Sequence, residues 1–153
     1  MSESDRSSST PSFQNHHQQF NTELAPKAIG PYSQACIFNE RLIFVSGQIG
    51  LDPQTGQLVS GGPTTHENDE IETVKAQTHQ TLKNLGNVLN EAGSGFSHVV
   101  KTTVLLTTMD HFAEVNKIYE QYFVDNKPAR ACFAVKQLPR NALVEIEAIA
   151  YKK

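Results

Sequence analysis

Arginine and glutamate side chains in two β-like segments near the C-terminus are the residues of this chain best suited to chemistry. The segments are 129–135 (ARACFAV) and 143–151 (LVEIEAIAY). Successive side chains of a strand point to opposite faces, so Glu145 and Glu147 share one face, about 7 Å apart. If the two strands pair antiparallel through their short connection, Arg130 and a carboxylate share the face that is turned away from a helix-covered core.

This pair predicts hydrolysis of a small substrate that carries a carboxylate. An arginine fork binds a carboxylate through two parallel hydrogen bonds, and a nearby glutamate orients or deprotonates a water for attack on an electrophilic carbon. The alternative is structural, because Arg130 could simply neutralise Glu145 or Glu147 across two strands. Spacing alone does not separate these two interpretations.

Other kinds of site find less support in the sequence. Cys132 could be a nucleophile, but no histidine is fixed beside it by sequence, and a small buried thiol is the commoner fate of a lone cysteine. The histidines lack metal-ligand spacing such as HxxxH, and the glycines form neither GxGxxG nor GxxxxGK[ST]. We therefore expect no metal and no organic cofactor.

The elements that must position these residues alternate in the order β-β-α-β-α-β-β. In chain order they are strands 35–38 and 41–46 around Asn39-Glu40, a surface loop 50–68, a helix from about 70 to 92 ended by Gly93, strand 98–107, a helix capped by Asp110 and closed by Pro128, and strands 129–135 and 143–151. This order favours an α+β sheet with both helices on one face. Ala131, Phe133 and Val135 suit the core under the helices, and an oligomer could cover the other face.

Length and composition set the class of protein. The chain has 153 residues, of which 38% are hydrophobic, enough for one domain over residues 23–153. A net charge of −3 disfavours a nucleic-acid partner. Two distant cysteines, Cys36 and Cys132, and no long apolar run indicate an intracellular protein that does not enter membranes.

Residues 1–22 are rich in Ser, Gln, Asn and His, and have no periodic apolar face. They are predicted to be a disordered arm. A mitochondrial transit peptide should be Arg-rich and poor in acids, whereas this arm has Arg6 beside Glu3 and Asp5. The expected location is therefore the cytoplasm, with mitochondrial import as the disfavoured alternative.

Four blocks of sequence, in order along the chain, are similar to the motifs of one known family. They are AIGPYSQA at 28–35, VSGQIGLDP with Thr55-Gly56 at 45–56, PARA with Leu138-Pro139 at 128–139, and VEIEA at 144–148. Over residues 25–152 the chain resembles the RidA/YjgF family. It departs from the family in its N-terminal arm and in the link at 124–127.

The resemblance implies a chorismate-mutase-like fold, assembled as a homotrimeric barrel with helices outside and substrate clefts between subunits. It implies a deaminase that hydrolyses reactive 2-imino acids, 2-iminopropanoate and 2-iminobutanoate, to 2-oxo acids and ammonia. By matching motif, Arg130 would bind the substrate carboxylate and Glu145 would position water, without a cofactor. The positions that match the cleft lining are Tyr32, Ser46, Gly47, Asn116 and Cys132. Glu147 would be structural.

Two other functions remain alternatives at this point. Members of the family are described as translation inhibitors with ribonuclease activity, which would require RNA binding. Acidic net charge and the lack of a basic stripe with aromatic residues argue against it. The other alternative is a holdase-type trimer that protects client proteins through exposed apolar surface.

Overall fold

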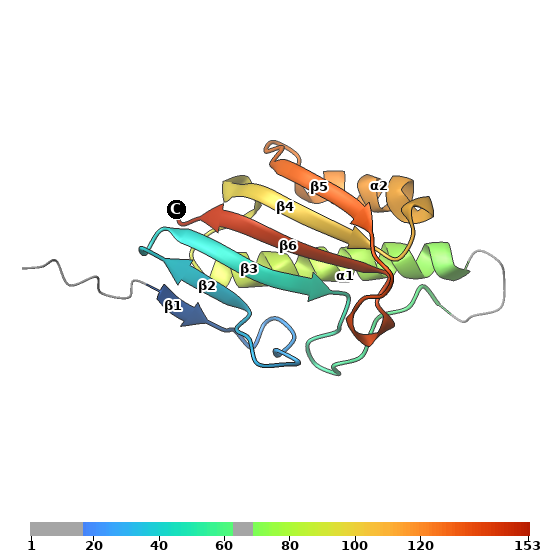
Figure 1. The fold of residues 1–153 in the computed structure, drawn as a ribbon, viewed down its shortest axis with the longest axis horizontal. Helices are drawn as coiled ribbons and strands as arrows, with labels where there is room; N and C mark the ends of the chain where they lie inside the picture. Colours follow the sequence, from blue (N-terminus) through green and yellow to red (C-terminus); the bar gives the residue numbers. More distant parts are fainter. Residues whose placement is uncertain (1–16, 63–68) are drawn as a thin grey trace, which may run out of the picture.

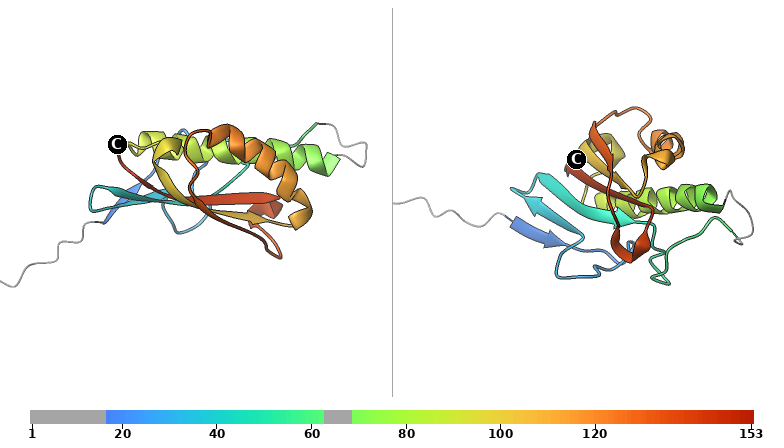
Figure 2. Two further views of the ribbon diagram at one scale, coloured as in Figure 1. Left: turned by 90° about the horizontal axis from the view of Figure 1, so that it is seen from above. Right: turned by 45° about the vertical axis from the view of Figure 1, so that its right-hand side comes forward.

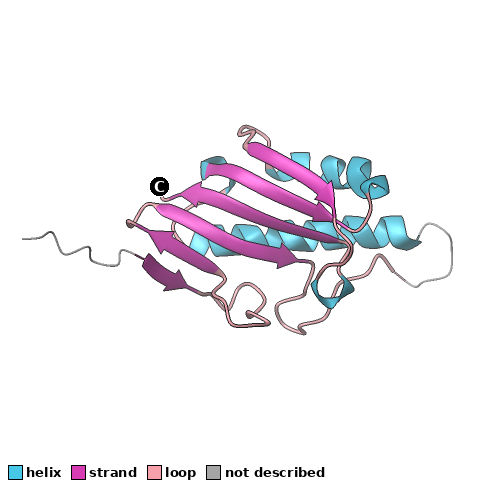
Figure 3. Ribbon diagram, in the orientation of Figure 1, coloured by secondary structure: helices cyan, strands magenta, loops and turns pink. Residues whose placement is uncertain are grey.

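A six-stranded sheet carries both main helices on one of its faces in the computed structural model of the chain (Figures 1 and 2). The structure describes residues 17–62 and 69–153. The strands are β1 (His17–Phe20), β2 (Ala35–Phe38), β3 (Leu42–Ile49), β4 (Val99–Leu106), β5 (Ala129–Ala134) and β6 (Val144–Tyr151), and the helices are α1 (Asp69–Glu91) and α2 (Phe112–Tyr122). The strand order is β1-β2-β3-β6-β4-β5, and only the β4–β5 pair is parallel. The α+β class and the one-sided helix layer are as predicted (Figure 3).

Helix α1 confirms the amphipathic pattern in the sequence. Leu82, Leu85 and Leu89 are fully buried against the sheet, as expected for apolar residues at helical spacing. The helix ends where Gly93 adopts a φ of +85°, and the amide of Ser94 donates to the carbonyl of Leu89. A glycine in the left-handed region is the usual residue at this position after a helix.

The turn between β2 and β3 also forms where it was predicted. Asn39 and Glu40 have φ values of 51° and 57°, the left-handed pair of a type I′ turn, and the amide of Arg41 donates to the carbonyl of Phe38 at 3.1 Å. Because Phe38 pairs with Leu42, the connection has three residues, one more than predicted. Glutamate rarely adopts the left-handed conformation. The antiparallel pairing of Phe38 with Leu42 closes the hairpin around it.

Strand β1 corrects the predicted boundary of the N-terminal arm. His17–Phe20 pairs antiparallel with Phe38–Ala35, so the predicted disordered arm of residues 1–22 is wrong from His17 onward. The HQQF segment has little propensity of its own and gains its structure from the edge of β2. Residues 1–16 lie outside the described residues.

The start of α2 differs from the prediction. Asp110 was expected to cap the helix, but it lies inside a short 3₁₀ turn, Met109–His111, that leads into α2. The side chain of Thr108 accepts the hydrogen bond from the amide of Asp110. Threonine, like aspartate, has a side-chain oxygen suited to this role, and the added 3₁₀ turn moves the cap two residues upstream.

The largest correction concerns the last two strands, which do not pair with one another. Strand β6 inserts between β3 and β4, and β5 pairs in parallel with β4 at the edge of the sheet. Residues 135–143 carry the chain past the end of β4 through a 3₁₀ turn, Pro139–Asn141. A small apolar cluster fixes this crossover, in which Leu138 and Ala142 pack with Ile49 and Leu51.

Asn84 joins α1 to the segment that follows β3. Its side-chain amide donates to the carbonyls of Ile49, at 3.0 Å, and Leu51, at 2.8 Å, and the residue is fully buried. We expect Asn84→Ala to lower the free energy of unfolding by about 2–3 kcal/mol, because two carbonyls each lose a buried hydrogen bond. Urea unfolding measures this, and Asn87→Ala, which removes an exposed hydrogen bond to Leu24, should cost less than half as much.

Candidate active site

A pocket of about 360 Å³ opens at the irregularity in β3, on the sheet face that the helices leave uncovered. Between Val45 and Gln48 the pairing with β6 shifts register, so Ser46 and Gly47 together oppose one residue of β6. Bulges of this kind bend a strand and often border functional sites. The residues that line the pocket are Ile29, Tyr32, Ser46, Gly47, Ile49, Pro139, Glu145 and Glu147.

Glu145 lines this pocket beside the bulge in β3, and its carboxyl is partly buried. Burial raises the pKa of its carboxyl, and the negative charge of Glu147 on the same strand face raises it further. The carboxylate lies directly over Gly47, where a β-carbon would stand 2.7 Å from Cδ of Glu145 and would overlap its oxygen Oε1. A glycine here leaves room for the Glu145 carboxylate, and a raised pKa makes that carboxylate a better proton acceptor than an ordinary glutamate.

Tyr32 and Ser46 are placed by hydrogen bonds to the loop before β2. The Tyr32 hydroxyl accepts from the amide of Ile29 at 3.2 Å, and the Ser46 hydroxyl donates to the carbonyl of Ser33 at 2.6 Å. Buried Gln34 anchors the same loop by donating to the carbonyls of Thr22, Ala25 and Pro26. Gln34 is a supporting residue that the sequence patterns did not single out, since its partners lie up to twelve residues away.

A second pocket, of about 410 Å³, surrounds Arg130. Its residues come from α2, β5 and the link between them: Asn116, Tyr119, Glu120, Phe123, Lys127, Pro128 and Arg130. The guanidinium Nη1 donates to Oδ1 of Asn116 at 2.8 Å, and its carbon Cζ lies 4.9 Å from the ring centroid of Tyr119. Within residues 17–62 and 69–153, no acidic side chain pairs with Arg130. The structural ion pair with Glu145 or Glu147 is thus absent from this part of the chain.

Arg130 and Glu145 lie on opposite faces of the sheet, which contradicts the prediction that they share one. Arg130 stands opposite Thr102 of β4, which is fully buried under the helices, whereas Glu145 stands opposite half-buried Leu105. Directly opposed residues of neighbouring strands point to the same side. The prediction failed because it placed Phe133 in the core, whereas Phe133 is 49% exposed on the open face.

Cys132 lies on the helix side, near Arg130 and packed against the core. Burial raises the pKa of its thiol, and the positive charge of Arg130 opposes this only in part. A thiol with a raised pKa is protonated at neutral pH and is a poor nucleophile. The geometry therefore favours a packing role for its side chain.

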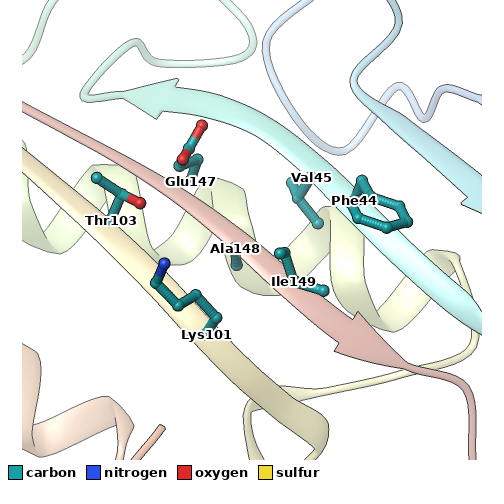
Figure 4. Close-up of a pocket in the computed structure, with 7 residues that line it drawn as sticks. All are labelled: Phe44, Val45, Lys101, Thr103, Glu147, Ala148 and Ile149. Atoms are coloured by element: carbon teal, nitrogen blue, oxygen red, sulfur yellow. The ribbon is translucent and has the colours of Figure 1, made fainter. Parts of the chain in front are cut away.

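The open face of the sheet also has a hollow of about 150 Å³ over β3, β6 and β4. Figure 4 shows Phe44, Lys101, Thr103, Glu147 and Ile149 around it. Phe44 is 43% exposed, and Phe133 at the sheet edge is more so. An apolar sheet face of this kind usually meets a partner surface.

The described residues show neither a metal-binding cluster nor a membrane-spanning helix. In the described ranges, no three His, Cys, Asp or Glu residues are grouped as they would be around a metal ion. None of the helices there has the length and apolar character needed to cross a bilayer.

Comparison with known proteins gives consistent matches over nearly the whole chain. The family model described as Endoribonuclease L-PSP matches residues 22–152. The human protein named 2-iminobutanoate/2-iminopropanoate deaminase is 51% identical over 129 residues, which are 84% of this chain and 85% of that protein.

Solved structures agree with these sequence matches. RidA from the Antarctic bacterium Psychrobacter sp. PAMC 21119 is 36% identical with a TM-score of 0.76, covering 88% of this chain and 98% of that one. Escherichia coli TdcF with bound serine is 34% identical with a TM-score of 0.75, covering 89% and 99%.

Proposed function

This chain belongs to the Endoribonuclease L-PSP family, and we propose that it is a deaminase that hydrolyses 2-iminobutanoate and 2-iminopropanoate to 2-oxo acids and ammonia. The observation that carries the proposal is a pair of pockets, one around an Arg130 fork that no acidic side chain of the described residues pairs with, and the other around the Glu145 carboxyl of raised pKa. Relatives at about half identity have this activity in their names. No cofactor enters the proposed reaction.

In the proposed mechanism, Arg130 binds the carboxylate of the imino acid. Asn116 occupies Nη1 at 2.8 Å, so the remaining N–H groups of the fork are available for a two-point contact. The bound serine of Escherichia coli TdcF, itself a carboxylate compound, is consistent with an amino-acid-sized ligand in this family.

Glu145 accepts a proton from water as the water oxygen forms a bond to C2 of the imine. The C=N bond becomes a single bond as the nitrogen takes the proton that Glu145 removed from water, and C2 then has one hydroxyl and one amino group, which makes a carbinolamine. Collapse of this carbinolamine breaks the C–N bond, releasing ammonia and leaving the 2-oxo acid. Because such imines hydrolyse in water unaided, positioning and proton transfer are sufficient for catalysis.

The two pockets would form one site across a subunit boundary of a homotrimeric barrel. Within one chain Arg130 and Glu145 lie on opposite sheet faces, so a shared site needs the Arg130 pocket of one subunit to meet the Glu145 pocket of the next. The exposed Phe44 and Phe133 would then be covered by neighbouring copies. Tyr32, Ser46 and Gly47 would complete the site from the Glu145 side.

A coupled assay tests the proposal. A threonine dehydratase generates 2-iminobutanoate, and release of 2-oxobutanoate is followed with and without the protein, while analytical ultracentrifugation measures the mass of the assembly. Acceleration above the uncatalysed rate by a particle of three chains supports both the activity and the trimer. A monomer that is active would refute the shared site, and a trimer without acceleration would refute the deaminase activity.

The raised pKa of Glu145 predicts how the activity depends on pH. The carboxylate form is the base, so kcat/KM should fall as the pH drops through a pKa above that of an ordinary glutamate. Glu147→Gln removes a negative neighbour, so the pKa of Glu145 should fall and the acid limb should move to lower pH. The measurement is kcat/KM against pH for both proteins after subtraction of the uncatalysed rate; an unmoved limb would contradict the assignment.

The family description raises ribonuclease activity as a second candidate. The net charge of −3 and two glutamates in the open pocket disfavour the binding of RNA phosphates. RNA cleavage that persists through purification to homogeneity and in Arg130→Ala would support the ribonuclease. Cleavage that separates from the protein on a column would mark a contaminant.

We place the proposed reaction in the cytoplasm. Fluorescence microscopy of the full chain with a C-terminal tag tests this, and signal inside mitochondria would refute it.

A further inference from the structure

We propose that Tyr119 is a positioning residue that sets the orientation of the Arg130 guanidinium and thereby the affinity for the substrate carboxylate. This inference rests on the function proposed above and concerns residues of α2 that contact Arg130 rather than the reacting atoms.

Arg130 requires such support because of its place in the fold. It lies on β5, an edge strand whose residues are mostly exposed. A long, exposed arginine side chain has many rotamers, and ordering it on binding costs free energy. A receptor for a carboxylate gains affinity when its fork is already held in the binding orientation.

One face of α2 supplies this support. Phe112, Asn116 and Tyr119 are spaced four and three residues apart, so they lie on the same side of the helix. The Arg130 carbon Cζ lies 5.7 Å from the ring centroid of Phe112 and 4.9 Å from that of Tyr119, while Asn116 holds one nitrogen.

Ring contacts of this kind leave the hydrogen-bonding edge of the guanidinium available. A cation–π contact uses the flat face of the guanidinium, whereas an acidic partner would occupy the N–H groups that a substrate carboxylate needs. Tyr119 thus orients the fork without competing for its donors.

The Tyr119 ring is itself held by two contacts. Its hydroxyl is 2.7 Å from Oγ1 of Thr102 on β4, and its ring stacks on Phe123 with centroids 4.3 Å apart. The side chain is 8% exposed, and burial raises the pKa of its hydroxyl, which therefore stays neutral. Because the Tyr119 ring is held in place, it can hold the Arg130 guanidinium that lies against it in one orientation.

The test compares Tyr119→Leu, Tyr119→Phe and a matched control in the coupled assay. Arg130 binds the carboxylate equally in the ground state and the transition state, so Tyr119→Leu should raise KM about tenfold with little change in kcat. Tyr119→Phe keeps the ring and should restore KM to within about threefold of the native value. Tyr122→Leu removes an aromatic ring of the same helix that contacts His79 and Phe96, and it should leave KM unchanged.

A second variant and a second readout keep the outcome decisive. If Tyr119→Leu does not fold, as judged by circular dichroism, Phe112→Leu removes the more distant ring and should raise KM about threefold. Calorimetric binding of 2-oxobutanoate, the reaction product, reports on the Arg130 fork without turnover.

The outcomes separate the inference from the proposed function. Native turnover with an unchanged KM in Tyr119→Leu, or an equal rise in Tyr122→Leu, overturns the positioning role alone. No native turnover together with weaker 2-oxobutanoate binding in Tyr119→Leu overturns the deaminase activity but supports the positioning role. Native protein that neither turns over the imine nor binds 2-oxobutanoate overturns both.

Discussion

Arg130→Ala is expected to lower kcat/KM for 2-iminobutanoate by about three orders of magnitude, mainly through a higher KM. The substitution removes the charged fork and leaves the substrate carboxylate without a partner in the pocket that Asn116 and Tyr119 help to line. Arg130→Lys keeps the charge but not the planar fork, so it should recover only part of the loss. The control is Arg41→Ala, which removes an equal charge from an exposed residue of the turn before β3. This variant should have native kinetics.

The proposed site between subunits gives a second test, in which the two variants are mixed. Arg130→Ala and Glu145→Ala subunits should each be inactive alone, yet a mixture that is unfolded and refolded together should recover about a quarter of native activity. In a random equimolar mixture about three quarters of trimers contain both variants, and each of these has one intact site of its three. Recovery requires that Arg130 and Glu145 come from different subunits. If the mixture stays inactive although mixed trimers form, the site does not cross the boundary.

Sequence reasoning named residues that line the two pockets, but it did not predict how those pockets are arranged. Arg130 and Glu145 stand out because few strand positions have charged side chains that alternate with apolar ones, and this pattern is local. Which strand lies beside which is not local, since β6 reaches its place between β3 and β4 through the crossover at 135–143. A period of two divides a strand into two faces but does not say which face meets the core.

Apolar residues on both faces of the sheet explain why the prediction assigned the side chains of β5 to the wrong faces. Phe133 is as hydrophobic as a core residue, yet it lies on the open face, while Arg130 lies under α2 beside Tyr119. The rule that buries phenylalanine in the core does not say which of two apolar sheet faces the helices cover. Local signals were more dependable: the Asn39-Glu40 turn and the end of α1 at Gly93 both formed where they were predicted.

Gly47→Ala is expected to lower kcat about a hundredfold while the fold remains stable. Gly47 has no left-handed φ, so the backbone accepts alanine, but the new methyl group would overlap the Glu145 carboxylate. The end of a flexible side chain yields at little cost in stability, and displacing it by about 1 Å or more takes the base away from its water. Because the Arg130 pocket is untouched, KM should change little, in contrast to Arg130→Ala. Gly95→Ala, whose β-carbon would approach no atom closer than 3.4 Å, is the control for adding a methyl group.

A double-mutant cycle identifies the cause of this loss. If alanine at position 47 acts only by displacing Glu145, then adding Glu145→Ala to Gly47→Ala should cost almost nothing further, because the base has already been removed from its place. Two independent effects would instead multiply. The measurement is kcat for the two single variants and the double variant, with thermal unfolding of each as a check on folding. It therefore decides whether a glycine is needed at position 47 to make room for the Glu145 carboxylate or for the backbone of β3.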